Sequence, residues 1–371
     1  MRPASDDRHL LRQRMQARGG KPKKDTVMNL QIVALLGQDG ITNGAIYALL
    51  ALSIVLVFTV TRILLIPQGE FVAFGALTMS VIQNGQRLWV VWLLVALCVA
   101  AALMDVVDML RRKRSRPSMW LPAKLLYAGV MAWLAFSLPL ASLPMLLQVI
   151  LTLALLVPTG PLMYRLVFQP IAGATPLVLL IVSIALHVAL VGVGLLVFGP
   201  DGARTAPFTD SNPSLGSFNL NSQALWVIGV SIGLIVALYQ MFERTLYGKA
   251  LRAAAMNRMG ARLMGISPVF AGKAMFFLAA LIGVMSGILI APITTIYYDS
   301  GFLISLKGFV GAIIGGLVSY PVAAIGAVFV GLIESFSTFW ASAYKEIIVF
   351  VLIIPVLLWR SLTSRHVEDE E

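Results

Sequence analysis

The sequence contains few charged residues, one cysteine and three histidines, and each shortage excludes a class of protein. Charged residues make up only 12% of the 371 residues. Cys98 has no second cysteine with which to form an intrachain disulfide, and one thiol cannot build a zinc or dithiol redox motif. His9 and His366 lie in the terminal tails, far in sequence from His187. We therefore expect no metal, no other cofactor, and no catalytic cluster of the kind that an integral-membrane enzyme needs.

Hydrophobic residues, by contrast, dominate the composition. They make up 59% of the chain, and the mean hydropathy is +0.88. A soluble domain cannot bury so much apolar surface, so lipid must solvate part of it. A helix needs roughly 20 apolar residues to cross the hydrocarbon core, and such stretches recur from Ile41–Val60 to Ile347–Trp359. The sequence therefore predicts an all-α fold, a polytopic transmembrane helical bundle.

Apolar windows without charges locate the individual segments. They are Ile41–Val60, Phe71–Ile82, Leu88–Met104, Leu125–Leu140, Leu146–Met163, Leu177–Phe198, Ala224–Met241, Met275–Ile293, Phe309–Val318, Val322–Phe339 and Ile347–Trp359. Phe71–Ile82 and Phe309–Val318 are too short to cross alone, so we expect them to be broken half-helices. Together the windows predict about 8–11 membrane segments in a transmembrane domain that spans residues 30–361.

Basic residues are concentrated in three segments, which accounts for the net charge of +11. These segments are the tail 1–29, Arg111–Lys124 and Arg244–Lys273. Lys and Arg accumulate in short cytoplasmic loops, so the pattern indicates topology rather than nucleic-acid binding. We expect residues 1–29 to form a disordered basic cytoplasmic tail before an uncleaved anchor, with Met28 as an alternative start. Residues 362–371 are expected to form a second cytoplasmic tail.

The basic segments also constrain how the first apolar segments cross. Three candidate spans separate the tail from Arg111–Lys124, and an odd number of crossings would put these two basic segments on opposite sides. We therefore expect one of the three not to cross. Phe71–Ile82 is the best choice, because Pro67 and Gly69 break any helix that precedes it. A broken helix at membrane depth is tolerated only where it lines a cavity, as in many transporters.

A short similarity late in the chain suggests an internal repeat. The segment Lys307–Ala312 resembles Gly69–Ala76, and each of the two follows an apolar span and a polar linker. Paired broken segments in two halves of a chain are typical of internally repeated transporters. The match is short, so chance similarity is the alternative.

The segment Thr245–Ile266 combines small and basic residues in a pattern that suits contact with another protein. On one continuous helix, with roughly 100° between residues, small residues share a single face: Ala250, Ala253, Ala254, Ala261 and Gly265. Small residues let a partner's backbone approach closely, and Arg252, Arg258 and Arg262 could pair with acidic groups on it. The alternative is an ordinary basic cytoplasmic loop.

Several segments, in the same order along the chain, resemble one family of transporters. Gly248–Ala255, followed by Ala261 and Gly265-Ile266, looks like the cytoplasmic loop of branched-chain amino-acid ABC permeases of the LivH/LivM type. The other matching segments are Asn43–Leu52 (first span), Gln68–Phe71 (broken-helix entry), Leu180–Leu186 and Phe198–Pro200 (middle), and Gly315-Gly316 and Gly331–Ser335 (end). The resemblance covers roughly residues 30–105 and 145–360.

The resemblance implies a non-catalytic permease that works with other chains. Gly248-Lys249 lacks the earlier glycine of a phosphate-binding loop, so separate ABC ATPase subunits would hydrolyse the ATP. A second permease subunit (a homo- or heterodimer), an extracytoplasmic solute-binding protein, and a bacterial inner-membrane location with both termini in the cytoplasm are also implied. Coupling to the ATPase is assigned to Thr245, Gly248, Ala250, Arg252, Ala253, Ala261 and Gly265.

Polar side chains inside apolar segments are costly and often functional, so they are candidates for the lining of a solute path. The strongest candidates are Asn43, Tyr47, Gln68 and Glu70. Helix capping is the alternative for the last two, and His187 is more simply explained as a packed interior histidine. Glu334 could face the path or pair with Lys307 or Lys345 inside the bundle.

The chain departs from the family pattern in ways that leave the solute open. Residues 105–144 add a hydrophobic segment and a basic loop, and we expect Leu125–Met163 to form a peripheral helical hairpin that turns near Pro139–Pro144. Gln68 stands where the family often has His. Branched-chain amino acids, urea and short amides all remain possible solutes. An ion-coupled secondary transporter of a small solute is the alternative function, for which only Glu70 and Glu334 could serve as intramembrane carboxylates.

Overall fold

The computed structural model describes residues 30–111, 120–209, 214–215, 218–219, 221–317 and 319–363. The expected tail 1–29, most of the expected tail 362–371, and the loop after Arg111 lie outside these ranges. The chain divides into two compact units, Met1–Leu35 and Leu36–Glu371. All contacts discussed below lie within the second unit.

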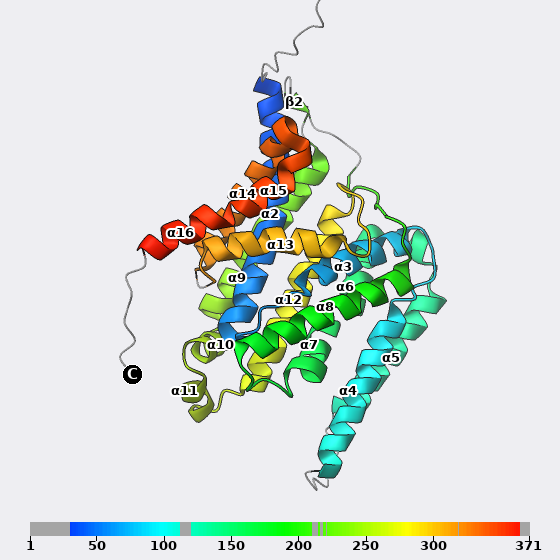
Figure 1. Cartoon of the computed structure of the whole chain (residues 1–371). Helices are drawn as coiled ribbons and strands as arrows, with labels where there is room; N and C mark the ends of the chain where they lie inside the picture. Colours follow the sequence, from blue (N-terminus) through cyan, green and yellow to red (C-terminus); the bar gives the residue numbers. More distant parts are fainter. Residues whose placement is uncertain are drawn as a thin grey trace, which may run out of the picture. The chain divides into compact units, whose positions relative to one another are not determined.

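The described residues form helices almost throughout (Figure 1). The α-helices are α2 (Leu30–Thr61), α3 (Gln68–Gln83), α4 (Val91–Arg111), α5 (Trp120–Ser137), α6 (Met145–Leu156), α7 (Thr159–Met163), α8 (Pro176–Phe198), α9 (Ser222–Arg244), α10 (Leu246–Met256), α11 (Arg258–Leu263), α12 (Pro268–Ile290), α13 (Ser300–Ile314), α14 (Tyr320–Ala341), α15 (Lys345–Val351) and α16 (Ile353–Thr363). The remaining elements are the 3₁₀-helices η1 (Leu140–Ser142) and η3 (Ser342–Tyr344), the π-helix η2 (Tyr164–Phe168), and a hairpin of β1 (Ser214–Leu215) and β2 (Phe218–Asn219).

Seven helical stretches among the described residues are long and apolar enough to cross a membrane. They are Ile32–Thr61, Val91–Arg111, Met145–Phe168, Pro176–Phe198, Ser222–Arg244, Pro268–Ile290 and Tyr320–Leu358. Between them lie α3 and α13, which have 16 and 15 residues and are too short to cross by themselves. The expected polytopic bundle with short inserted helices is confirmed, although the late short helix begins at Ser300 rather than at Phe309.

Close backbone contact brings α2 and α14 together in opposite directions. A Cβ at Gly44 would lie 2.8 Å from a Cα atom of α14, so only glycine fits there. Ser335 Oγ donates to the Leu36 carbonyl at one end of the pair, at 2.7 Å. At the other end the hydroxyls of Thr59 and Tyr320 lie 3.2 Å apart. Because α2 is continuous, Leu36 and Thr59 lie near opposite ends of the bundle.

The half-helix α3 begins halfway along the length of the bundle and finishes at one end of it. Pro67 precedes the helix directly, and nearly all of the α3 residues are buried. Gln68 Nε2 donates to the carbonyl of Ala279, halfway along α12, at 3.0 Å. At the far end, Gln83 Oε1 accepts from the backbone N–H of Ala206 at 2.8 Å. The expected helix break at Pro67 is therefore present, and α3 covers only part of the depth of the bundle.

The second short helix, α13, starts where α3 starts. A Cβ on Gly69 would lie 2.1 Å from the Gly301 carbonyl oxygen, and a Cβ on Gly301 would lie 2.1 Å from that of Gly69. The expected pair of short helices is present, but its closest contact is in the first turn of α13 and not within Lys307–Ala312. Gly308 instead faces α2, where its Cβ would lie 2.7 Å from that of Leu50.

The prediction that one of the first three segments fails to cross is wrong. Thr61, the last residue of α2, lines a small cavity together with Ala254 and Pro268 of the basic segment 244–273. From Thr61 the chain reaches Gln83 at the opposite end through a non-helical link and α3, and α4 then returns to Arg111. The link completes the crossing that the half-helix covers only in part. The start of the second unit and the segment 244–273 therefore lie at opposite ends, while the tail 1–29 is outside the described residues.

The added segment contributes the end of α4 and the whole of α5, and these two helices lie side by side as a hairpin (Figure 1). Arg165 of η2 donates to Asp105 at 2.9 Å and to Asp108 at 2.6 Å, and Lys124 of α5 donates to Asp105 at 2.5 Å. These ion pairs join the hairpin to the neighbouring span. After α5 the chain turns through η1 into α6, so the expected turn near Pro139–Pro144 is present. The expected hairpin Leu125–Met163 is not the packed pair, because α5 packs chiefly against α4 rather than α6.

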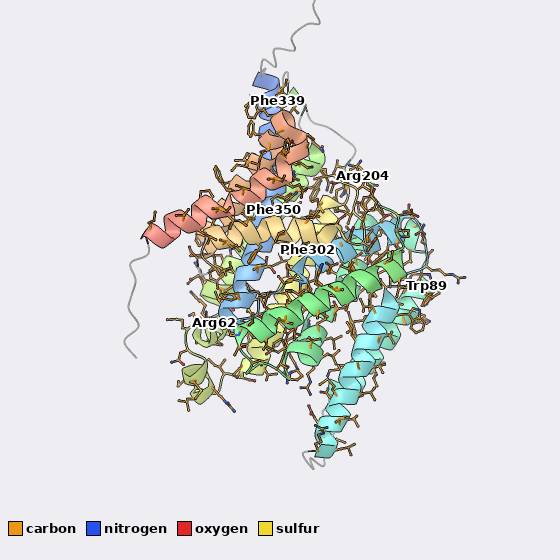
Figure 2. The ribbon with its side chains drawn as sticks, in the orientation of Figure 1. Arg62, Trp89, Arg204, Phe302, Phe339 and Phe350 are labelled. Carbon is orange, nitrogen blue, oxygen red and sulfur yellow. The ribbon has the colours of Figure 1, made fainter. Side chains whose placement is uncertain are left out.

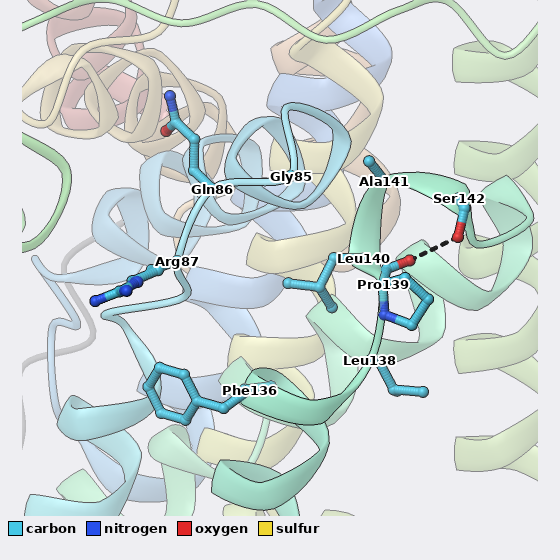
Figure 3. Close-up of a pocket in the computed structure, with 10 residues that line it drawn as sticks. Gly85, Gln86, Arg87, Phe136, Leu138, Pro139, Leu140, Ala141 and Ser142 are labelled. Atoms are coloured by element: carbon cyan, nitrogen blue, oxygen red, sulfur yellow. Dashed lines mark hydrogen bonds between the residues drawn. The ribbon is translucent and has the colours of Figure 1, made fainter.

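A cavity of about 530 Å³ lies where this turn meets the loop that follows α3 (Figure 3). Phe136 and Leu140 line it from the hairpin, and Ser142 Oγ donates to the Pro139 carbonyl at its edge. Arg87, the charged residue of the lining, is exposed to solvent. Because no buried polar group converges on it, this cavity is a surface hollow rather than a candidate site.

Candidate functional site

The structure separates the four residues that were expected to border a solute path. Asn43 and Tyr47 line one polar cavity, whereas Gln68 and Glu70 lie at the buried start of α3 and do not line it. The two pairs therefore belong to two different environments, which are described in turn.

The first environment is a cavity of about 480 Å³, here called the Lys307 cavity. Its walls come from α2, the segment that follows α12, and helices α13, α14 and α15, with Asn221 and Ala224 from the start of α9. Charged residues of both signs line it: Asp39, Lys307, Glu334, Lys345 and Glu346. It lies in the half of the bundle that contains Leu36 and Ile290, away from the basic segment 244–273.

Lys307 and Glu334 form a buried ion pair in this cavity. Lys307 Nζ lies 2.5 Å from Glu334 Oε1, and the two residues are only 6% and 7% exposed. Tyr47 donates its hydroxyl to the other carboxylate oxygen, Glu334 Oε2, at 2.6 Å. The Lys307 ammonium also lies 5.9 Å from the centre of the Tyr47 ring. The expected pairing of Glu334 with Lys307 or Lys345 is confirmed for Lys307.

The local sequence explains how Lys307 reaches this position. Gly308 follows it directly, and the missing side chain lets α13 approach α2 closely enough for Lys307 to meet Tyr47. On the partner helix α14, Thr338 Oγ1 donates to the Glu334 carbonyl, and the next residue, Ser335, is tied to α2. An ion pair in a low-dielectric site must be well placed to offset the loss of hydration, and this packing holds both partners.

The rest of the lining gives the cavity a mixed character. Its aliphatic residues are Leu36, Ile290, Ile293, Ile296, Leu303 and Ile304, and its hydroxyl residues are Thr42, Thr294, Thr295, Ser300, Ser335 and Thr338. Ligand sites for small molecules combine apolar walls with a few convergent polar groups. The Lys307 cavity has this composition.

The second environment surrounds Gln68 and Glu70. Glu70 Oε1 lies 2.9 Å from His187 Nδ1, and the carboxyl group is 1% exposed. His187 packs in turn against Phe302, the residue after Gly301, with ring centres 4.8 Å apart (Phe302 is labelled in Figure 2). The interpretation of His187 as a packed interior histidine is therefore supported, and its partner is Glu70. His187 and Phe302 also line an apolar cavity of about 260 Å³.

Two oxygen atoms in this second environment lack a hydrogen-bond partner among the described residues. They are Gln68 Oε1 and Glu70 Oε2, and both are buried. Ser183, one turn before His187 on α8, accepts from the backbone N–H of Ile66 and donates to the Leu64 carbonyl. The helix α8 thus contacts both the non-helical link and the start of α3.

Sequence reasoning missed Asp39 and Glu346 as residues of the polar cavity. Glu346 lies 3.6 Å from Lys307 and has a side chain that is 38% exposed. The sequence did not indicate that Glu346 belongs to a cavity, because it directly precedes the apolar window Ile347–Trp359 and follows the short 3₁₀-helix η3. The feature of the sequence that could have indicated this cavity is Lys307, a charged residue within an apolar stretch.

The segment that was expected to contact a partner is two helices rather than one. Asn257 has an extended backbone between α10 and α11, and its side chain accepts from Gly260 N at 2.8 Å as the cap of α11. Thr245 caps α10 in the same way by accepting from Gly248 N. The premise of a continuous helix, with five small residues on one face, is therefore wrong, because Asn257 breaks the helix.

The residues assigned to coupling divide into those that build this region and those that face outward. A Cβ on Gly248 would lie 2.1 Å from the Met241 carbonyl oxygen, so Gly248 is part of the turn between α9 and α10. Arg252 pairs with Glu243 at 2.6 Å instead of standing free. The remaining small residues are buried (Ala261), half-buried (Ala250) or exposed (Ala253 and Gly265).

Large apolar side chains are exposed on this helix pair, beside the exposed small residues Ala253 and Gly265. Leu246, Met256, Met259, Leu263 and Met264 are each more than 70% exposed. We call these five residues the α10–α11 surface. An exposed apolar patch rimmed by basic residues marks a contact with another protein or with a membrane.

Comparison with known proteins identifies the family. Residues 123–357 match the family model described as the branched-chain amino acid transport system / permease component. The chain belongs to this family. The matched residues include Lys307, Glu334, Glu346 and the α10–α11 surface, and they also include part of the added segment 105–144.

The chain is also similar in sequence to individual curated members of this family. The chain is 26% identical over 204 residues to the high-affinity branched-chain amino acid transport system permease protein BraD of Pseudomonas aeruginosa, covering 53% of this chain and 66% of that protein. It is 27% identical over 203 residues to LivH of Escherichia coli, covering 52% and 65%. A probable branched-chain amino acid transport permease protein LivH of Methanocaldococcus jannaschii is 29% identical over 256 residues, covering 62% and 78%. The chain thus spans a little under two thirds of the length of the first two relatives, and no solved structure matches it.

Proposed function

We propose that this chain is the solute-conducting permease subunit of an ATP-driven importer for branched-chain amino acids or a similar small solute. The observation that carries the proposal is membership of the permease family over residues 123–357. The names of the relatives, which describe branched-chain amino acid permeases, support the solute class. The Lys307 cavity offers a place for a small polar solute inside the bundle.

Energy for transport comes from separate ATPase subunits in this proposal. Gly248-Lys249 is not preceded by the glycine that a phosphate-binding loop requires, so the segment cannot cradle ATP phosphates. The α10–α11 surface is the docking site for an ATPase. Its exposed leucine and methionine side chains supply the apolar contact, while Lys249 and Arg262 at its rim attract acidic groups.

The other proposed partners are a second permease subunit, identical or related, and an extracytoplasmic solute-binding protein. The protein resides in the bacterial inner membrane, with the basic segments 111–124 and 244–273 in the cytoplasm, as their own Lys and Arg content favours. Because α2 begins at the other end of the bundle, this orientation replaces the expectation that the N-terminus is cytoplasmic. Asp108 and Lys124, which lie beside the first basic segment and at its end, are found at the same end of the bundle as Arg165 and Thr61, and Ala254 and Pro268 of the second segment lie there too. The Lys307 cavity then lies in the extracytoplasmic half, where a binding protein would deliver solute.

Reconstitution tests the proposal and its alternative together. The permease, its ATPases and its binding protein are placed in proteoliposomes, and uptake of radiolabelled leucine is measured with ATP inside. Uptake that requires ATP, disappears when the catalytic glutamate of the ATPase is replaced, and persists with a protonophore supports the importer. Uptake that a protonophore abolishes without any need for ATP would instead establish the ion-coupled transporter, in which Glu70 or Glu334 would carry the ion.

A further inference from the structure

Lys307 lies between two carboxylates that hold it unequally. Glu334 is 2.5 Å away, buried, and saturated by Lys307 on one oxygen and Tyr47 on the other. Glu346 is 3.6 Å away and its side chain is 38% exposed. The first contact is part of the packed interior. The second is long and open to the cavity, so it can exchange for another pair of charges at low cost.

We propose that Lys307 and Glu346 form the charge-recognition site for a zwitterionic solute, in which Lys307 binds the solute's carboxylate and Glu346 its ammonium group. This assignment rests on the proposed function, since it treats the Lys307 cavity as part of the solute path. In the structure the two side chains face one another. A zwitterion inserted between them replaces one loose ion pair by two, and the net charge of the cavity does not change.

The position of the pair favours a zwitterion over a neutral solute such as urea. Separating Lys307 from Glu346 leaves a lysine that is only 6% exposed without its second carboxylate, and a neutral solute offers no charge to replace that carboxylate. A solute with a single charge would compensate one side chain only. Opposite charges on neighbouring atoms, as in an α-amino acid, satisfy both.

The wall next to the pair accounts for the other half of such a solute. Leu303 and Ile304 precede Lys307 on the same helix by about one turn. Ile290, the last residue of α12, and Ile293 in the following turn line the same cavity. An aliphatic side chain between these residues would lose its contact with water. The cavity volume of about 480 Å³ is within the range for small-ligand sites.

Direct binding to the full-length permease in lipid nanodiscs tests the assignment. The probe is radiolabelled L-leucine, and the unlabelled competitors are L-leucinamide, which lacks the carboxylate, 2-hydroxy-4-methylpentanoate, which lacks the ammonium group, and urea. For the wild type we expect competition by leucine at concentrations roughly tenfold or more below those of either analogue, because each analogue loses one charge-assisted contact. Urea should not compete.

The variants assign each contact to a residue. In Glu346→Gln, leucine binding should weaken roughly tenfold while binding of the hydroxy acid stays the same, so that the two become similar. Lys307→Arg should retain binding, whereas Lys307→Met combined with Glu334→Gln, which leaves no unpaired buried charge, should lose it. Arg87→Met removes one positive charge on the same end of the bundle and should bind like the wild type. Glu346 is partly exposed, so its variant is expected to fold, as gel filtration and thermal unfolding will show.

The outcomes separate this assignment from the proposed function. Leucine binding that is unchanged in Glu346→Gln and in the Lys307→Met/Glu334→Gln double variant overturns the assignment, as does competition by urea or the absence of any leucine binding to the wild type. ATP-driven uptake by the complete complex is measured in parallel. If the wild-type complex transports leucine and the variants do so equally well, the site is wrong and the importer stands. If the wild-type complex transports nothing with ATP, the importer itself is wrong.

Discussion

The backbones of Gly69 and Gly301 touch at the point where the half-helices α3 and α13 begin. The contact is reciprocal, because a Cβ on either glycine would lie 2.1 Å from the carbonyl oxygen of the other. One residue further along, Glu70 and Phe302 both contact His187 of α8. The two interrupted segments of the bundle therefore share one junction, and the side chains around it come from α3, α8 and α13.

Replacement of either junction glycine should destabilise the protein. A methyl group at Gly69 or Gly301 meets backbone and not a movable side chain, so Gly69→Ala and Gly301→Ala should each cost about 1–3 kcal/mol or more. The midpoint of thermal unfolding of the detergent-purified protein measures the effect. Gly192→Ala on α8 is the matched control, since nothing lies within 4 Å of its Cβ position, and it should be neutral or stabilising. Equal midpoints for all three variants would show that the junction does not exist in solution.

Glu70 as a residue of the solute path stays a prediction, and two substitutions test it against a purely structural role. His187→Ala leaves a buried carboxyl group without its partner, which should cost about 1–3 kcal/mol. Glu70→Gln keeps the shape and a hydrogen-bonding group. Because Glu70 is 1% exposed and does not line the Lys307 cavity, we expect Glu70→Gln to keep leucine uptake. Reduced uptake with an unchanged unfolding midpoint would place Glu70 on the path after all.

Polar replacement of the α10–α11 surface should uncouple ATP hydrolysis from uptake. Met256→Ser and Leu263→Ser change side chains that are 88% and 86% exposed, so the stability of the isolated permease should change by less than about 0.5 kcal/mol. We expect the assembled complex to lose solute-stimulated ATPase activity and uptake. Ala253→Leu, at an exposed position earlier on α10, should also interfere with docking.

Gly248→Val distinguishes docking from local folding in the same region. Its side chain would collide with the Met241 carbonyl, so this variant should lower both the unfolding midpoint and the coupling. Wild-type uptake in Met256→Ser, Leu263→Ser, Ala253→Leu and Gly248→Val would exclude the α10–α11 region as the ATPase contact.

Cysteine labelling in spheroplasts tests the proposed orientation. Cys98 is buried in α4 and can be replaced by serine to give a background without thiols. We expect Ser115→Cys, in the basic loop, to react with an impermeant maleimide only after permeabilisation. Ala141→Cys, in the turn between α5 and α6, should react in intact spheroplasts. The reverse pattern would invert the orientation and move the Lys307 cavity to the cytoplasmic half.

Hydrophobic periods and helix-breaking residues are local properties, and the elements that depend on them could be predicted well. Composition within a window of about 20 residues is enough to predict several elements. These are the long spans, the break at Pro67, the turn near Pro139–Pro144 and the short lengths of α3 and α13. The cap at Asn257 was equally local, and it was missed because a run of small residues suggested one continuous helix.

The number of membrane crossings was harder to predict. The bias of Lys and Arg shows which loops lie on the same side, but it does not show how the chain between them crosses. Three crossings between the tail and Arg111 looked inconsistent with a common side, and the short segment was chosen as the exception. The structure completes that crossing with a non-helical link, whose polar groups find partners such as Ser183. No sequence window contains that compensation, since Ser183 lies on α8.

The sequence by itself determined that this chain is a lipid-solvated polytopic helical bundle with interrupted segments and basic loops, because hydropathy, Pro and Gly placement and charge act locally along the chain. Only the tertiary structure decided which polar residues meet. In the structure, Asn43 and Tyr47 lie apart from Gln68 and Glu70. Glu334 pairs with Lys307, Glu70 pairs with His187, and Glu346 lines the Lys307 cavity. The physical reason is that each buried charge must find its partner across helices. Which partner it finds depends on how closely the glycines let those helices approach.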